Sequence, residues 1–410
     1  MQSPFKDLPR EISVLVAASF FVAVGFGIVL PAIPVFARTF GVSNAAIGLI
    51  VSMFAITRFS SGLISGKLVD LFGEKAVFSS GVFMVAIFVF LAGLSTTYSQ
   101  LLFFRAAGGL GSSMFSVAAG SVIMRSVDDE HRGRAQSVYN GAFLLGGVSG
   151  PAIGGLLSLI SLRAPFFAYS AMLLISGTVA YFFLKGERIG TRQKDLDSGE
   201  HTTVREALAM KPYRIALVLV FVVSWAVFGL RSSIIPIFVT EELHSTIAVV
   251  GYGFALSAIF QGALLLHGGR ISDSKGRKWA SMIGASIGLV GITVLSLATH
   301  PWMYLVAMSI IGVGGAYLST TPSNIVGDII RGRGGQVIAV FQMAGDAGMI
   351  VGPIIIGVLS DVYSYRTAIA VSAIVFALGA ILTTQIPETR QSFLPENSER
   401  PQINNLRSLD

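Results

Sequence analysis

Twelve apolar runs, each about 20 residues or longer, fill most of this 410-residue chain. A run of that length crosses the hydrocarbon core of a bilayer as one helix, which pairs its own backbone groups. Charged residues make up 12% of the chain, about half the fraction of a soluble protein. This composition therefore argues against a soluble enzyme, a nucleic-acid-binding domain and a disordered chain. We expect an all-α integral membrane protein with spans near residues 12–36, 46–65, 76–97, 100–123, 137–160, 164–184, 215–239, 246–267, 279–299, 302–325, 336–360 and 365–386.

A polar stretch divides these runs into six plus six. We expect a cytoplasmic N-terminus over residues 1–11, one six-helix bundle over 12–184, a cytoplasmic linker over 185–214, a second bundle over 215–386 and a disordered tail over 387–410. Within the linker, Thr203 is followed three residues later by Glu206 and then by apolar residues. This pattern is typical of a capping box, so it predicts a short helix.

The basic residues follow the predicted topology. Of the 29 Lys and Arg, 23 lie at the termini, in the linker and in the connections on the same side, while Arg38, Arg163 and Arg366 lie on the other side. The remaining three lie within spans. Because Lys and Arg are enriched in cytoplasmic loops, both termini are predicted to be cytoplasmic in a plasma or inner membrane.

The sequence lacks the residues that metal binding, ATP binding and enzymatic catalysis need. The chain has no Cys, and its five His are scattered without the spacing of metal ligands, so neither a metal nor another cofactor is expected. No Gly-x-x-x-x-Gly-Lys-Ser/Thr motif is present to bind ATP. A membrane enzyme or sensor is a remote alternative, because no nucleophile and base set is evident.

The two halves of the chain repeat each other. Gly66 and Asp70 return as Gly269 and Asp273, both displaced by 203 residues, and Gly150-Pro151 returns as Gly352-Pro353 at 202. Equivalent loops lie on the same predicted side. The bundles are therefore parallel repeats about an axis along the membrane normal, which is a transporter architecture with its site between the halves.

These residues resemble the major facilitator superfamily, and the resemblance covers the chain from Glu11 to Ile386. The loop after span 2 is similar to the family's signature, and span 4 carries the Arg105 and Gly108 of another family motif. Span 5 resembles the motif of 12-span drug/proton antiporters, with Gly146, Gly150, Pro151, Gly154 and Gly155. The resemblance implies that the loops form a conformational latch, whose residues are Gly66, Asp70, Gly73, Lys75, Gly269, Asp273 and Gly276.

The glycines of span 5 recur every four residues, so they form one stripe that permits close helix packing. We expect this stripe to form a tight seam between the two halves that limits leak. Generic small-residue packing is the alternative.

Four charges lie within spans, namely Arg58, Arg105, Arg231 and Asp346. Such charges are costly in lipid and are candidates for function. The resemblance implies that spans 2 and 11 face each other, so that Arg58 and Asp346 can pair. Proton coupling is assigned to Asp346, Arg58 and Arg105, although the pair is alternatively a permanent structural one. Arg105 either modulates a proton-accepting group or binds substrate.

Arg231 either lines a cavity or extends to the outer surface. The candidate cavity residues are Tyr139, Phe143, Trp225, Phe228, Arg231, Tyr252, Gln261 and Tyr317. The predicted function is proton-coupled efflux of lipophilic or amphipathic small molecules by alternating access. A proton symporter or uniporter that imports an anionic metabolite is the alternative. The expected partners are a small-molecule substrate, protons and the lipid bilayer, without nucleic acid, and the expected assembly is a monomer.

Overall fold

The computed structural model describes residues 9–127, 129–184, 202–319, 321–329 and 335–387, and no strand occurs within these ranges. Most of the predicted linker, the N-terminal residues 1–8 and nearly all of the tail lie outside them. The first half of the chain contains α1 (Arg10–Val29), α2 (Ala32–Arg38), α3 (Asn44–Ser60), α4 (Gly62–Phe72), α5 (Glu74–Leu94), α6 (Tyr98–Ser126), α7 (Asp129–Ile160) and α8 (Ala164–Phe183).

The second half begins with the short helix α9 (Val204–Ala209), which opens on the predicted capping box of Thr203 and Glu206. It continues with α10 (Lys211–Ser224), the π-helix η1 (Trp225–Ile234), α11 (Ile235–Ile237), the π-helix η2 (Phe238–Glu242), α12 (Ile247–Ser274), α13 (Arg277–Ser296), α14 (Pro301–Leu318), α15 (Thr321–Ile329), α16 (Gly335–Val362) and α17 (Tyr365–Thr383).

These elements form the twelve predicted spans. Across the described residues, ten helices are long and apolar enough to cross a membrane, and the pair α3 and α4, bent by 49°, makes an eleventh. The twelfth is α7, whose apolar portion runs from Ser149 to Ile160. The first span is interrupted at Pro31, between α1 and α2. Proline removes a backbone donor, which accounts for the break.

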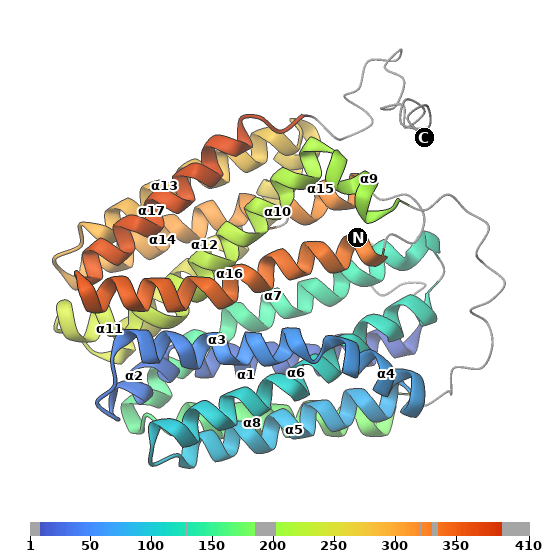
Figure 1. The fold of residues 1–410 in the computed structure, drawn as a ribbon, viewed down its shortest axis with the longest axis horizontal. Helices are drawn as coiled ribbons and strands as arrows, with labels where there is room; N and C mark the ends of the chain where they lie inside the picture. The colour runs from blue at the N-terminus through green and yellow to red at the C-terminus, as the bar shows by residue number, and fades with distance from the viewer. Residues whose placement is uncertain (1–8, 128, 185–201, 320, 330–334, 388–410) are drawn as a thin grey trace.

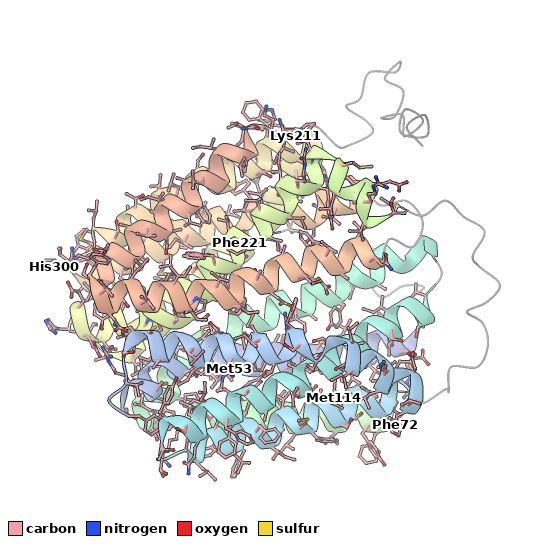
Figure 2. The ribbon with its side chains drawn as sticks, viewed as in Figure 1. Met53, Phe72, Met114, Lys211, Phe221 and His300 are labelled. Atoms are coloured by element: carbon pink, nitrogen blue, oxygen red, sulfur yellow. The ribbon has the colours of Figure 1, made fainter. Side chains whose placement is uncertain are left out.

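The spans lie side by side, and the connections gather at two ends (Figure 1). We call one the basic end, where α4 and α5 meet and where α12 and α13 meet, with Lys67, Lys75 and Lys275 nearby. The other is the distal end, where α2 is followed by α3 and where α13 is followed by α14. In Figure 2, Phe72 and Lys211 lie toward the basic end and His300 lies at the distal end.

Each half has its own apolar core, and the two cores meet near the distal end. Ile237 of α11 packs into the core of the first half, and Leu30 packs into the core of the second. Helix α3 contacts α16, and α7 contacts α12 across the halves. These two seams position the residues of the candidate site.

Candidate functional site

Arg58 of α3 and Asp346 of α16 form an ion pair that joins the two halves. The two helices are antiparallel neighbours, and one turn and a half toward the distal end the Ser52 hydroxyl donates to the Ile350 carbonyl at 2.7 Å. The exposed fractions of the paired side chains are 33% for Arg58 and 16% for Asp346. The pair therefore lies where the seam between α3 and α16 gives way to accessible space.

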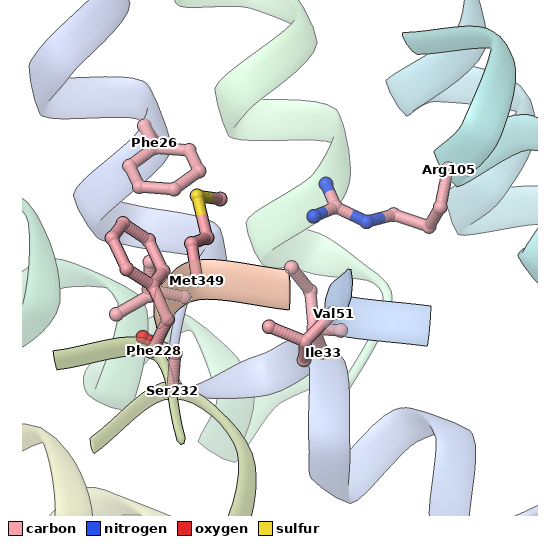
Figure 3. A pocket seen from close by; sticks show the side chains of 8 residues that line it. Phe26, Ile33, Val51, Arg105, Phe228, Ser232 and Met349 are labelled. Atoms are coloured by element: carbon pink, nitrogen blue, oxygen red, sulfur yellow. The ribbon is translucent and has the colours of Figure 1, made fainter. Parts of the chain in front are cut away.

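Arg105 of α6 is buried, and none of the residues that the structure describes supplies a counter-charge. The residue is 5% exposed, and its Nε has no hydrogen-bond acceptor. Its guanidinium lies over the Phe54 ring, 4.6 Å from the ring centroid. Arg105 also lines a pocket between the halves, and Figure 3 shows it extending toward Phe26 and Met349. The pocket residues are Phe26, Leu30, Ile33, Val51, Arg105, Phe228, Ser232 and Met349.

Arg231 lies on η1 and remains inside the protein. Its guanidinium is 4.7 Å from the centroid of the Phe254 ring, and its Nε is buried without an acceptor. Nη2 is 3.4 Å from the Phe254 carbonyl oxygen, which is a weak contact. In this structure the side chain therefore packs against α12 and does not extend to the outer surface.

The aromatic candidates lie in different surroundings. Phe228 lines the pocket, whereas Trp225 is buried and donates its Nε1–H to the Ser372 hydroxyl at 3.1 Å. Tyr252 is 47% exposed. The remaining three aromatics and Gln261 do not line this pocket. The Tyr139 ring is tilted against the Phe143 ring, Tyr317 contacts His267, and Gln261 lies against Gly315.

A polar network closes the distal end. Arg38 Nη2 donates to Glu241 Oε2 at 2.7 Å and to the Tyr365 hydroxyl at 2.9 Å, so it joins α2 to η2 and α17. Asp361, at the end of α16, accepts the backbone N–H groups of Asn44 and Ala45, both at 2.8 Å. These are the first residues of α3, where unpaired N–H groups attract a carboxylate.

This distal network was not predicted from the sequence. Arg38 was visible as one of three basic residues on that side, but its partners Glu241 and Tyr365 lie 203 and 327 residues away. Asp361 resembles any polar residue at the end of a span. A carboxylate at the C-terminus of a helix interacts unfavourably with that helix's own dipole. This unfavourable position is the one sequence signal that Asp361 caps a different helix.

The loops at the basic end share a backbone geometry and differ in their contacts. Gly73 has φ +80° and Gly276 has φ +101°, a conformation that favours glycine and permits the tight turns. In the second loop, Arg277 Nη1 donates to Asp273 Oδ1 and to the Ser272 hydroxyl, both at 2.9 Å, and its Nε donates to Asp328 at 3.0 Å.

In the first loop, the exposed Asp70 has no hydrogen-bond partner among the described residues. The partner that the sequence suggested for this carboxylate is thus not in place in this conformation. Nor does a neighbour crowd Gly66 or Gly269: a Cβ at either position would meet nothing within 4 Å. Lys75 lies 5.4 Å from the centroid of the Tyr181 ring.

The glycine stripe of α7 faces α1 of the same half, so the prediction that it forms the seam between the halves is wrong. A Cβ at Gly150 would lie 2.6 Å from the Gly27 Cα, while Gly146 and Gly154 meet the backbone of Phe20 and Ile28. The stripe permits close packing, but its spacing cannot reveal which helix is the neighbour.

Gly155, one residue out of register with the stripe, is the motif glycine that reaches the other half. A Cβ there would lie 2.8 Å from the Cα of Gly251 in α12. Beside it, the Pro151 carbonyl oxygen is 3.1 Å from a Cβ built on Gly251. The second half mirrors this arrangement, because Gly352 of α16 packs on η1 and Gly357 packs on α3.

Comparison with known proteins agrees with this architecture. The family model described as Major Facilitator Superfamily matches residues 15–233 and 217–407, so the chain belongs to this superfamily. It is 26% identical over 369 residues to an uncharacterised transporter of this type from Methanocaldococcus jannaschii, covering 90% of this chain and 95% of that protein. It is also 26% identical over 385 residues to Multidrug resistance protein 1 of Bacillus subtilis strain 168, with coverage of 90% and 95%.

Solved structures show the same fold. The crystal structure of a bacterial homologue of the human lysosomal transporter Spinster, in an inward-facing and unoccupied conformation, matches with a TM-score of 0.77 at 17% identity. The match covers 92% of this chain and 97% of that one. Because the chain belongs to the Major Facilitator Superfamily, the protein is a multi-pass membrane transporter of small molecules and not an enzyme.

Proposed function

We propose that this protein is a proton-driven antiporter that exports lipophilic or amphipathic small molecules by alternating access, with its basic end in the cytoplasm. The observation that carries the proposal is the Arg58–Asp346 pair. The pair connects the two halves at the depth where a transporter of this architecture has its site. Any motion that separates α3 from α16 also separates the two charges.

The distal network corresponds to a closed outer side. When the distal end opens, Asp346 leaves Arg58. A carboxylate deprived of its counter-charge in a low dielectric is neutralised by a proton, which here comes from outside. Closure of the distal end brings Arg58 back, and the proton leaves to the inside. In the opposite state, the Asp70 and Asp273 loops latch the basic end.

Neutralising the acid tests this mechanism. We expect Asp346→Asn in proteoliposomes to abolish substrate export driven by a proton gradient while substrate exchange continues without a gradient. Arg366→Gln serves as the control, because Arg366 pairs with Glu242 within one half. If Asp346→Asn transports against a gradient at the normal rate, the assignment of Asp346 is wrong. If the variant fails to insert or fold, the pair is a structural one, whose disruption costs about 3–5 kcal/mol.

A second candidate function is import of an anionic metabolite by proton symport or uniport. The observation in its favour is charge: Arg58, Arg105 and Arg231 lie in spans, against one embedded carboxylate, Asp346. The direction of the gradient separates the two. Export requires uptake of substrate into inside-out vesicles that is driven by an acidic lumen, whereas symport requires an acidic exterior.

A further inference from the structure

Arg105 is a buried cation that no anion in the described part of the chain neutralises. Among the described residues it has no ion pair or hydrogen bond, and its contact with Phe54 uses the ring face. Asp346, the carboxylate that lies within a span, is already paired with Arg58. A guanidinium carries five N–H donors, so those of Arg105 are free for a ligand.

The surroundings of Arg105 define the rest of that ligand. The pocket is apolar and aromatic, with Phe26, Met349 and Phe228 opposite the guanidinium (Figure 3). In this conformation the cavity volume is about 10 Å³, room for about one water molecule, so the body of a ligand fits only after the two halves separate. Residues of both halves contribute, so a ligand bound there would be sensed by both.

We propose that this pocket binds lipophilic monoanions, in which an aromatic or alkyl body carries one carboxylate or sulfonate group that pairs with Arg105. This substrate class deepens the proposed transport function and rests on it. A cationic amphiphile would place like charges side by side in a low dielectric, where their repulsion is strong. A neutral ligand would leave Arg105 without an anionic acceptor, which costs binding free energy.

Three probes that share one fluorophore and differ in charge test the proposal. Dansylglycine is a monoanion near neutral pH, dansylamide is neutral and dansylcadaverine is a cation. Binding to the purified, reconstituted transporter is measured by fluorescence without any proton gradient. We expect the wild type to bind dansylglycine most tightly. Arg105→Gln should weaken dansylglycine binding by about tenfold or more, because it removes charge-assisted hydrogen bonds.

The same variant should bind dansylamide as tightly as the wild type or more tightly, because fewer donors are then left without an acceptor, and this binding also shows that the variant is folded. Arg105→Lys retains the charge and should preserve the preference for the anion, with weaker binding because the planar fork is lost. Arg366→Gln is the matched control, since it removes a surface guanidinium at the distal end and should change none of the three affinities.

Two results would overturn the anionic substrate class. One is a wild type that binds dansylcadaverine or dansylamide more tightly than dansylglycine, or does not bind dansylglycine. The other is an equal loss of all three probes in Arg105→Gln, which would make Arg105 a structural residue. Because binding is measured without a gradient, Arg105-dependent selection of the anion stands even if transport proves uncoupled from protons.

Discussion

The embedded arginines differ in whether the protein supplies their counter-charge. Arg58 is paired with Asp346, whereas Arg105, at 5% exposure, has no ion-pair partner within the described ranges. A buried charge without a partner destabilises the folded state, and such a residue usually persists only where it has a function. Stability and function should therefore respond in opposite directions at Arg105.

We predict that Arg105→Met raises the thermal stability of the ligand-free transporter in detergent, by about 1–3 kcal/mol. Arg58→Met is the matched control and should lower stability, because it leaves Asp346 without its partner. Thermal unfolding followed by fluorescence checks both variants. A lower midpoint for Arg105→Met would mean that the contact with Phe54 outweighs the cost of burying the charge.

At the scale of elements, the spans were predictable and their partners were not. Apolar length alone indicates a membrane helix, which is why all twelve spans were found. The π-helical geometry of η1 was not predictable, because its residues are as apolar as those of any span. Gly150 signalled close packing, yet nothing in its spacing distinguishes α1 from a helix of the other half.

The site was predicted in part. Arg58 and Asp346 were paired through the family resemblance and the internal repeat, and the structure brings them together. The pocket was not found, apart from Arg105 and Phe228, because its walls come from apolar residues that pack like core. The partners of Arg277 were also missed, since Asp328 lies 51 residues away on another span.

The cap that Asp361 places on α3 should hold the distal end closed. We predict that Asp361→Asn weakens this closure by about 1 kcal/mol, roughly a fivefold shift in population, because the amide keeps one acceptor and loses the charge. Spin labels on cysteines at Thr96 and His300, which lie in distal loops of the two halves, report the separation. Longer distances are expected in Asp361→Asn.

Glu242→Gln is the control for this measurement, because Glu242 pairs with Arg366 inside one half. Unchanged distances in Asp361→Asn would show that the Arg38 network closes the distal end without help from the cap.

At the scale of the whole molecule, the proposed transport direction depends on which end of the protein faces the cytoplasm. Because the chain has no Cys, single cysteines can be added without a background. We predict that Lys275→Cys, at the basic end, reacts with an impermeant maleimide only after cells are permeabilised. His300→Cys, which is exposed at the distal end, should react in intact cells. The reverse pattern would contradict the positive-inside assignment.

The unpaired Arg105 also bears on how the membrane potential acts on the carrier. If a monoanion leaves the cytoplasm in exchange for one entering proton, two elementary charges cross the bilayer per cycle. Each charge is worth about 2.3 kcal/mol at 100 mV, so an inside-negative potential of that size would contribute about 4.6 kcal/mol to export. A neutral substrate would gain half as much from the voltage, and a monovalent cation nothing. Selecting an anion thus makes the electrical part of the proton-motive force the larger driving term in cells near neutral pH.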